Sequence, residues 1–317
     1  MRRSTLAAAV FAVLVVGLGG FYVARNPERE TLDDTARKAA PGRFIQLSDG
    51  VTHYKLDGPD SGRTVVLVHG FSVPLYIWDS TAIALAAAGY RVLRYDEYGR
   101  GWSDRPMVDY TADLYDRQLN ELLDSLRITD RVDIGGVSMG GWVTATFAGR
   151  HANRTRSLIL VDPVASPEKP PSPTFQSRLL GLPVIGAYVF QTAAVPTMAD
   201  GQASDFANPN QFPDWADRYR SQVRYRGFGH ALLSTRRQQS RVDLDSVYRT
   251  VDRASIPVLL VWGTEDKTVP FARNTRVRAA ISRAEFHQIQ GAGHLPILEQ
   301  ATLTDSLILA FLARQPR

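Results

Sequence analysis

The sequence contains no cysteine among its 317 residues. This absence excludes a disulfide scaffold, thiolate zinc sites and a cysteine nucleophile. Lysine is also scarce: only four of the 37 basic residues are lysines, and the arginines are spread along the chain without a long run. Because a surface that binds nucleic-acid phosphates needs clustered basic residues, the formal charge of +5 does not indicate a nucleic-acid partner.

Two common motifs are missing as well. The chain has no G-x-x-x-x-G-K-S/T loop for a nucleotide and no H-E-x-x-H pair for a metal, and its six histidines are dispersed. We therefore expect no cofactor and no metal ion. With 44% hydrophobic residues the chain can bury a core, and its chemistry must come from serine, histidine, carboxylate, tyrosine or arginine side chains.

An uncharged run covers residues 5–24 (TLAAAVFAVLVVGLGGFYVA), directly after Arg2 and Arg3 and one serine. At 1.5 Å per residue, a helix of this length spans about 30 Å, the thickness of a bilayer's hydrocarbon core. We expect residues 1–25 to be an uncleaved membrane anchor, with the catalytic domain on the extracytoplasmic side because the two arginines favour a cytoplasmic N-terminus. The alternative is a signal peptide, after whose cleavage the protein is secreted or periplasmic. Residues 26–42 are charged and are expected to form a linker.

From residue 43 onward, short apolar runs alternate with longer segments of helical character. The expected strands cover residues 44–47, 51–56, 65–70, 91–96, 131–136, 157–162, 257–263 and 284–291. The expected helices cover residues 76–88, 112–126, 139–150, 271–281 and 296–312. This alternation predicts an α/β fold with a mostly parallel, doubly wound sheet and helices on both faces.

The alternation fails in residues 166–254, which open with a proline-rich stretch and continue with irregular helical segments. We interpret this segment as an inserted helical cap, so that residues 43–165 and 255–317 form the core. Within the cap, residues 179–190 (LLGLPVIGAYVF) carry no charge but are too few to span a membrane. We expect this run to be buried over a pocket or to lie at an interface, packed either on the core or against an apolar acyl group. Two glycines and a proline argue against one rigid helix.

The clearest chemical motif is G-x-S-x-G at residues 136–140, with Ser138 at its centre. An apolar strand precedes it and a helix-forming run follows it at once. This is the strand–turn–helix setting of a nucleophile elbow, in which the tight turn leaves no room for larger flanking residues.

A serine hydroxyl is a weak nucleophile and needs a base. His294 lies in the loop between the last strand and the last helix, whereas the other five histidines lie in strands, at a helix end, before a turn or in the cap. The second ring nitrogen of such a base needs an acceptor. Asp266 follows the strand 257–263 at the same sheet edge, and Glu265 and Asp162 are competing acceptors.

Two backbone N–H groups are needed for the developing oxyanion. One is expected from Met139, the residue after the nucleophile. The other is expected from Phe71, in the loop that follows the strand 65–70.

Together these features resemble the α/β-hydrolases, and in particular a bacterial serine hydrolase of the esterase/lipase-like group with a cap domain. The matching motifs, spread over residues 43–317, are His69-Gly70-Phe71-Ser72, Asp96-x-x-Gly99-x-Gly101-x-Ser103-Asp104, the elbow at Ser138, the Asp266 loop and Gly293-His294. The order serine, aspartate, histidine is also the order of this family. The resemblance implies an eight-stranded sheet whose second strand is antiparallel, and a cap that shapes the substrate pocket. We interpret the Asp96 turn as structural.

The sequence therefore predicts a membrane-anchored serine hydrolase that cleaves carboxylic esters, with apolar acyl or lipid-like groups, through an acyl-enzyme. A cofactor-free C–C bond hydrolase or a perhydrolase with the same triad is the first alternative. A hydrolase-fold protein that binds a ligand with little turnover is the second. The expected partners are a small-molecule or lipid ester and, through the N-terminal helix, a membrane.

Overall fold

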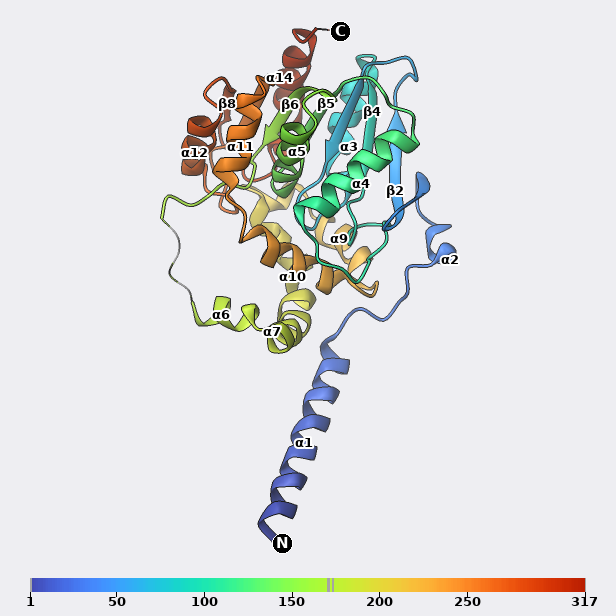
Figure 1. Ribbon diagram of the computed structural model, residues 1–317, viewed down its shortest axis with the longest axis vertical. Helices are drawn as coiled ribbons and strands as arrows, with labels where there is room; N and C mark the ends of the chain where they lie inside the picture. The colour runs from blue at the N-terminus through green and yellow to red at the C-terminus, as the bar shows by residue number, and fades with distance from the viewer. Residues whose placement is uncertain (1, 170–171, 173, 317) are drawn as a thin grey trace.

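The computed structural model describes residues 2–169, 172 and 174–316, and its centre is one eight-stranded sheet (Figure 1). The strands are β1 (Arg43–Leu47), β2 (Gly50–Asp57), β3 (Thr64–Val68), β4 (Arg91–Tyr95), β5 (Val132–Val137), β6 (Thr155–Val161), β7 (Val258–Gly263) and β8 (Glu285–Ile289). They lie in the order β1-β2-β4-β3-β5-β6-β7-β8. The pairs β1–β2 and β2–β4 are antiparallel and all the others are parallel, which confirms the predicted α/β-hydrolase topology.

Helices cover both faces of this sheet, as the apolar strands require. One face carries α4 (Ala112–Ser125), α5 (Met139–Arg150), α11 (Leu244–Arg253) and α12 (Asn274–Ala280), and the other carries α3 (Asp79–Ala87) and α14 (Ala301–Ala313). Short turns η1 (Leu75–Trp78) and η6 (Phe271–Arg273) precede α3 and α12. The two faces form two apolar layers, with Trp142 buried in one and Ile308 in the other.

The last expected helix, 296–312, is interrupted. It forms α13 (Pro296–Glu299) and α14, with Gln300 between them at φ −130° and ψ 46°, outside the helical region. The interruption lets the chain turn after Glu299. The Glu299 carboxylate then accepts hydrogen bonds from backbone N–H groups of the cap and of the His294 loop, at Ala207 and Gly293.

The cap consists of short helices between β6 and α11. They are α6 (Phe175–Gly181), α7 (Pro183–Val189), the π-helical η2 (Phe190–Ala194), η3 (Val195–Thr197), α8 (Met198–Gly201), η4 (Gln202–Asp205), η5 (Pro209–Gln211), α9 (Trp215–Val223) and α10 (Phe228–Gln239). The expected cap also included α11, but α11 packs on α5 and α12, and the Tyr248 hydroxyl donates to the Val164 carbonyl at the core. We therefore propose that the cap ends near Asp243.

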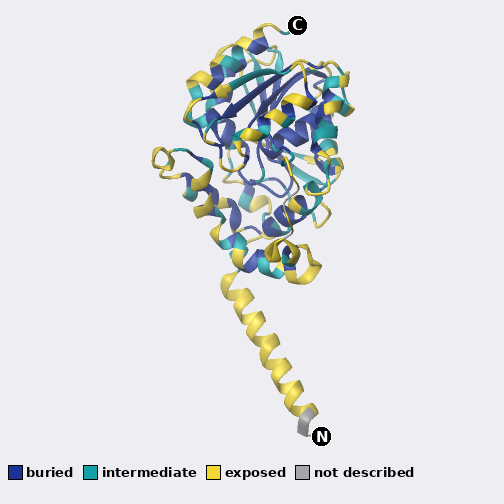
Figure 2. Cartoon of the chain, turned by 90° about the vertical axis from the view of Figure 1, so that its left-hand side faces the viewer, coloured by how far each residue is buried: buried dark blue, intermediate teal, exposed yellow. Residues whose placement is uncertain are grey.

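The N-terminal helix α1 (Arg2–Arg25) projects away from the rest of the chain (Figures 1 and 2). Its described side chains are exposed up to Arg25, and residues 4–25 are the one described helix that is long and apolar enough to cross a membrane without a bend. The cap lies between α1 and the sheet. A membrane that held α1 would therefore lie on the cap side of the protein.

The stretch 26–42, expected to be a linker, makes contacts with both the cap and the core. The Glu28 carboxylate accepts hydrogen bonds from the backbone N–H groups of Gly227 (2.7 Å) and Gly229 (2.6 Å). After the short helix α2 (Asp34–Arg37), the buried Arg37 pairs with Asp104. Charged residues of this expected linker thus hold it against the rest of the protein.

Candidate active site

Ser138 stands between β5 and α5 with a φ of 56° and a ψ of −119°, so the expected strand–turn–helix is confirmed. A positive φ is unfavourable for a residue with a side chain, and such strain is characteristic of functional turns. The flanking glycines are required because neighbouring backbone atoms leave no room for a side chain. A Cβ on Gly136 would lie 2.2 Å from the Gly140 carbonyl oxygen, and one on Gly140 would lie 2.4 Å from the His69 carbonyl oxygen.

The loops after β7 and β8 bring Asp266 and His294 together. His294 Nδ1 lies 2.8 Å from Asp266 Oδ2, and both side chains are buried. The other carboxylate oxygen, Oδ1, accepts hydrogen bonds from the backbone N–H groups of Thr268 and Val269. Asp266 is therefore held in place as an acceptor, which leaves Nε2 of a neutral His294 as the free basic nitrogen.

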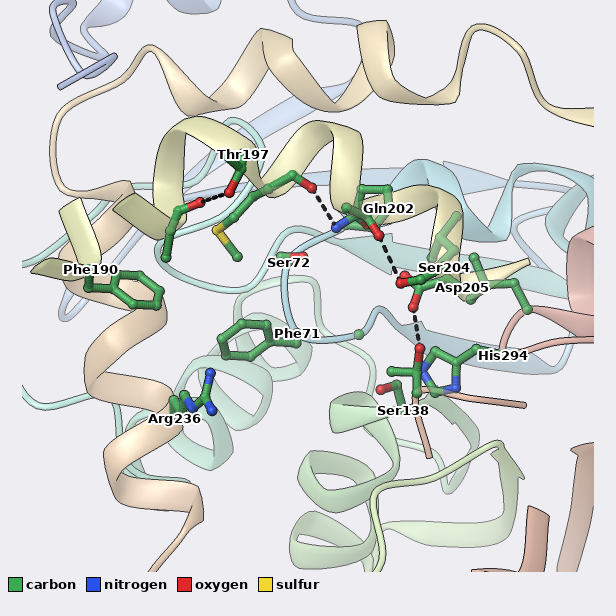
Figure 3. Close-up of a pocket in the computed structure, with 18 of the residues that line it drawn as sticks. Phe71, Ser72, Ser138, Phe190, Thr197, Gln202, Ser204, Asp205, Arg236 and His294 are labelled. Carbon is green, nitrogen blue, oxygen red and sulfur yellow. Dashed lines mark hydrogen bonds between the residues drawn. The ribbon is translucent and has the colours of Figure 1, made fainter. Parts of the chain in front are cut away.

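Ser138 and His294 line the same cavity, and Figure 3 draws them beside each other. The cap contributes Asp205 to this group, because the His294 backbone N–H donates to the Asp205 carbonyl oxygen at 2.8 Å. Burial opposes the charged form of His294, but the hydrogen bond and charge of Asp266, together with the charge of Asp205, raise its pKa above the ordinary value of 6.5. Sequence reasoning missed Asp205, since nothing in the irregular cap marks it.

The two competing acceptors have other environments. Glu265 is exposed to solvent. Asp162 is fully buried, its Oδ1 accepts a hydrogen bond from the Gly263 N–H (2.8 Å), and its Oδ2 has no hydrogen-bond partner among the described residues. Burial, and then the charge of Asp266, raise the pKa of Asp162 well above its ordinary value, which favours a neutral acid.

Ligand atoms of Asp162, Asp266 and His294 lie within 4.8 Å of one another, a spacing that a metal ion can also use. The donor set fits a metal poorly. Asp162 favours its protonated form, and His294 Nδ1 already shares a hydrogen bond with Asp266. We therefore propose that Asp162, Asp266 and His294 hold no metal ion.

The two expected oxyanion donors flank Ser138. Within the described part of the chain, the backbone N–H groups of Phe71 and Met139 donate no hydrogen bond. A Cβ on Gly70 would lie 3.3 Å from the Ser138 Cβ, so the Phe71 loop runs directly past the serine. The buried Arg100 holds this loop, because its Nε donates to the Phe71 carbonyl oxygen at 2.8 Å. Sequence reasoning placed Arg100 in a structural turn and did not connect it with the donors.

The cavity that contains Ser138 has a volume of about 660 Å³ and is lined by apolar side chains together with polar ones such as Gln202 and Arg236. Three residues of the segment 179–190 line this cavity, namely Leu180, Val189 and Phe190. The expected burial holds for only part of the segment: α6 and α7 meet in a bend, and Val184 on the outer side of the bend is 80% exposed. One face of the segment serves the cavity and the other faces outward.

The other polar motifs have structural roles. His53 Nδ1 lies 2.7 Å from Asp96 Oδ2, and Asp96 also accepts hydrogen bonds from the backbone N–H groups of Leu75 and Trp102, which supports the structural interpretation of this turn. Burial lowers the pKa of His69 to about 4, and its Nε2 accepts a hydrogen bond from the Glu97 backbone. Neither histidine lines the cavity of Ser138.

Comparison with known proteins agrees with this architecture. A family model described as alpha/beta hydrolase fold matches residues 63–301. The 2-hydroxy-6-oxononadienedioate/2-hydroxy-6-oxononatrienedioate hydrolase of Paraburkholderia phymatum is 27% identical, over 88% of this chain and 98% of its own length. Lipase 1 of Psychrobacter immobilis is 24% identical, over 81% of this chain and 79% of its own. The structure of a membrane phospholipase A, a bacterial virulence factor, matches 99% of this chain and 98% of its own with a TM-score of 0.70; at 21% identity this likeness establishes the fold alone.

Proposed function

Because the chain belongs to the alpha/beta hydrolase fold family, we propose that it is a serine hydrolase that cleaves carboxylic esters with an apolar acyl group. The observation that carries the proposal is the position of Ser138. It occupies a strained turn beside a cavity that is partly lined by apolar side chains, and the histidine of a buried His–Asp pair lines the same cavity. Such strain persists only where the surrounding structure holds it.

In the proposed mechanism, Nε2 of His294 takes the proton of Ser138 as the hydroxyl attacks the ester carbonyl. Asp266 keeps the proton on Nδ1 and stabilises the imidazolium that forms. The N–H groups of Phe71 and Met139 donate to the oxyanion, and His294 then protonates the leaving alcohol. Water, activated by the same histidine, releases the acyl group from Ser138.

The cavity favours an apolar acyl group over a dicarboxylate. The Paraburkholderia relative is named for a dienedioate, whose carboxylates need cationic partners. Among the described residues that line this cavity, Arg236 is the only cation besides His294, and Asp205 adds a negative charge. A C–C bond hydrolase acting on a dicarboxylate remains the alternative that the sequence similarity favours.

Two measurements separate these functions. A fluorophosphonate probe should label Ser138 and leave a Ser138→Ala variant unlabelled, whereas a ligand-binding protein without turnover would not react. A panel of soluble esters and a dienedioate should then show cleavage of the esters. Cleavage of the dienedioate alone would refute the ester proposal and favour the C–C bond alternative.

We further propose that α1 anchors the enzyme in a membrane, with the catalytic domain on the extracytoplasmic side. Support comes from the uncharged run at residues 5–24 and from the exposure of its side chains. The full-length protein should sediment with membranes, resist carbonate extraction and be digested by protease added outside the cell membrane. A soluble mature protein that begins after about residue 24 would indicate a cleaved signal peptide instead.

A further inference from the structure

The cap contacts α1 well inside the uncharged run of that helix, residues 5–24. The Tyr188 hydroxyl of α7 donates to the carbonyl oxygen of Leu18 at 2.8 Å, and the rings of Tyr188 and Tyr22 lie 5.9 Å apart. Leu18 precedes Ala24, the last uncharged residue, by six residues. At 1.5 Å per residue it lies about 9 Å deeper than the end of the run. If residues 5–24 span the hydrocarbon core, α7 therefore enters the same bilayer.

Several apolar side chains of α6 and α7 are exposed to solvent. Phe175 on α6 is 82% exposed, and Val184 and Ile185 on α7 are 80% and 51% exposed. Large apolar side chains exposed together on one surface of a soluble protein mark membrane or partner sites. Taken together, α6 and residues 183–205 have the length and hydropathy of a membrane-spanning helix, but they are bent by 115° at Leu182.

Backbone carbonyl groups at the bend have hydrogen-bond partners within the protein. A helix end leaves carbonyl groups without partners, and such groups are costly in lipid. Here the Arg237 guanidinium donates to the carbonyl oxygens of Leu180 and Leu182. The guanidinium comes from α10, and the only charged residue within α6 and α7 themselves is the exposed Arg178.

We propose that the α6–α7 bend, residues 175–189, inserts into the bilayer that holds α1 and opens the cavity of Ser138 toward the lipid. A lipid bilayer is the partner that the structure favours for this surface. A bilayer that holds α1 already reaches Tyr188, so no further partner is needed. The inner side of the same bend supplies Leu180 and Val189 to the cavity. An acyl chain can therefore pass from the lipid to Ser138 along apolar side chains. The inference rests on the proposed anchoring by α1.

The absence of cysteine makes a direct test available. A Val184→Cys variant of the full-length protein carries one thiol, to which a fluorophore can be attached. In phosphatidylcholine vesicles, the fluorophore at position 184 should be quenched by nitroxide on the lipid acyl chains and shielded from iodide in the buffer. The matched control is Ile83→Cys on α3, where an apolar side chain is 71% exposed on the core. The fluorophore there should be quenched by iodide and unaffected by the nitroxide lipid.

Two results would overturn the proposal. Equal iodide quenching at positions 184 and 83 would show that the bend stays in water. Shielding from iodide without quenching by nitroxide lipid would show that protein, such as a second copy of the chain, covers the bend. The anchor is tested separately by carbonate extraction, so its failure is distinguishable from failure of the bend to insert.

The consequence for activity is a selective loss. Val184→Asp combined with Ile185→Asp should slow hydrolysis of a long-chain ester embedded in vesicles by about ten-fold or more, because charged side chains resist insertion. It should leave hydrolysis of a soluble acetyl ester unchanged, since neither residue lines the cavity of Ser138. Equal rates on the embedded ester for variant and wild type would contradict entry through the bend. If wild type cleaves neither ester, the proposed function fails, while the quenching experiment still decides the position of the bend.

Discussion

The assignment of Asp266 as the acid of the triad is open to a sharp test, because a second buried aspartate lies beside it. Asp266 Oδ2 lies 2.8 Å from His294 Nδ1, whereas the Asp162 Oδ1 accepts its hydrogen bond from the Gly263 backbone. Asp266→Asn replaces a charged acceptor with a neutral amide. The proton on His294 is then no longer held on Nδ1, and the imidazolium loses its stabilising charge.

For Asp266→Asn we expect kcat to fall by about 10⁴, a loss of about 5.4 kcal/mol of transition-state stabilisation. Asp162→Asn is the matched control. Burial favours the neutral form of Asp162, and asparagine keeps its Oδ1 acceptor at nearly the same volume. We expect a loss of less than about ten-fold there, corresponding to less than about 1.4 kcal/mol.

The pH dependence provides an independent readout. His294 must be neutral to act as the base, so kcat/KM should rise with pH through the pKa of His294. Asp266 helps to raise that pKa above the ordinary value of 6.5. Removing its charge in Asp266→Asn should therefore move the rising limb to lower pH, whereas Asp162→Asn should leave it in place. A larger loss in Asp162→Asn than in Asp266→Asn, measured on a soluble ester, would show that the acid follows β6.

Three further predictions concern the elbow and the cavity. Ser138→Ala should abolish ester turnover while leaving the melting temperature near that of wild type; retained turnover would disprove the elbow assignment. Leu180→Asp should raise KM for long-chain esters more than for acetyl esters, because each buried methylene contributes about 0.8 kcal/mol, or roughly four-fold in KM; equal effects would mean that Leu180 only supports the cap. Gly140→Ala should lower stability by about 1–3 kcal/mol through overpacking, whereas Gly181→Ala, with no atom within 4 Å of its Cβ, should not; equal melting temperatures would contradict the close approach at the elbow.

Much of the fold could be predicted from the sequence because its elements are locally encoded. Apolar runs such as residues 65–68 and 257–263 identify buried parallel strands, and the glycines around Ser138 mark the tight turn between a strand and a helix. The order of the α/β-hydrolase motifs then supplied the antiparallel second strand. The interruption at Gln300 was missed, because residues 296–312 have a helical pattern throughout and no proline or glycine stands at the break.

Particular positions show where sequence reasoning reached its limit. Ser138, Asp266 and His294 each follow a strand of one parallel sheet, so the chain order already directs them to the same edge. Asp205 and Arg100 carry no such mark. Asp205 reaches His294 only because the cap folds back over the core, and Arg100 reaches Phe71 across 29 residues of chain.

The sequence by itself determined the parallel sheet, the elbow, the apolar N-terminal run and the candidate triad, because each depends on local patterning and on strand order. Only the tertiary structure decided which side of residues 179–190 faces the cavity and which aspartate forms a hydrogen bond with His294. It also decided that residues 26–42 contact the cap and the core. The physical reason is that an uncharged segment has the same composition whether its side chains turn inward or outward. Contacts with α1, α10 and the cavity choose between these orientations, and those partners lie far away along the chain.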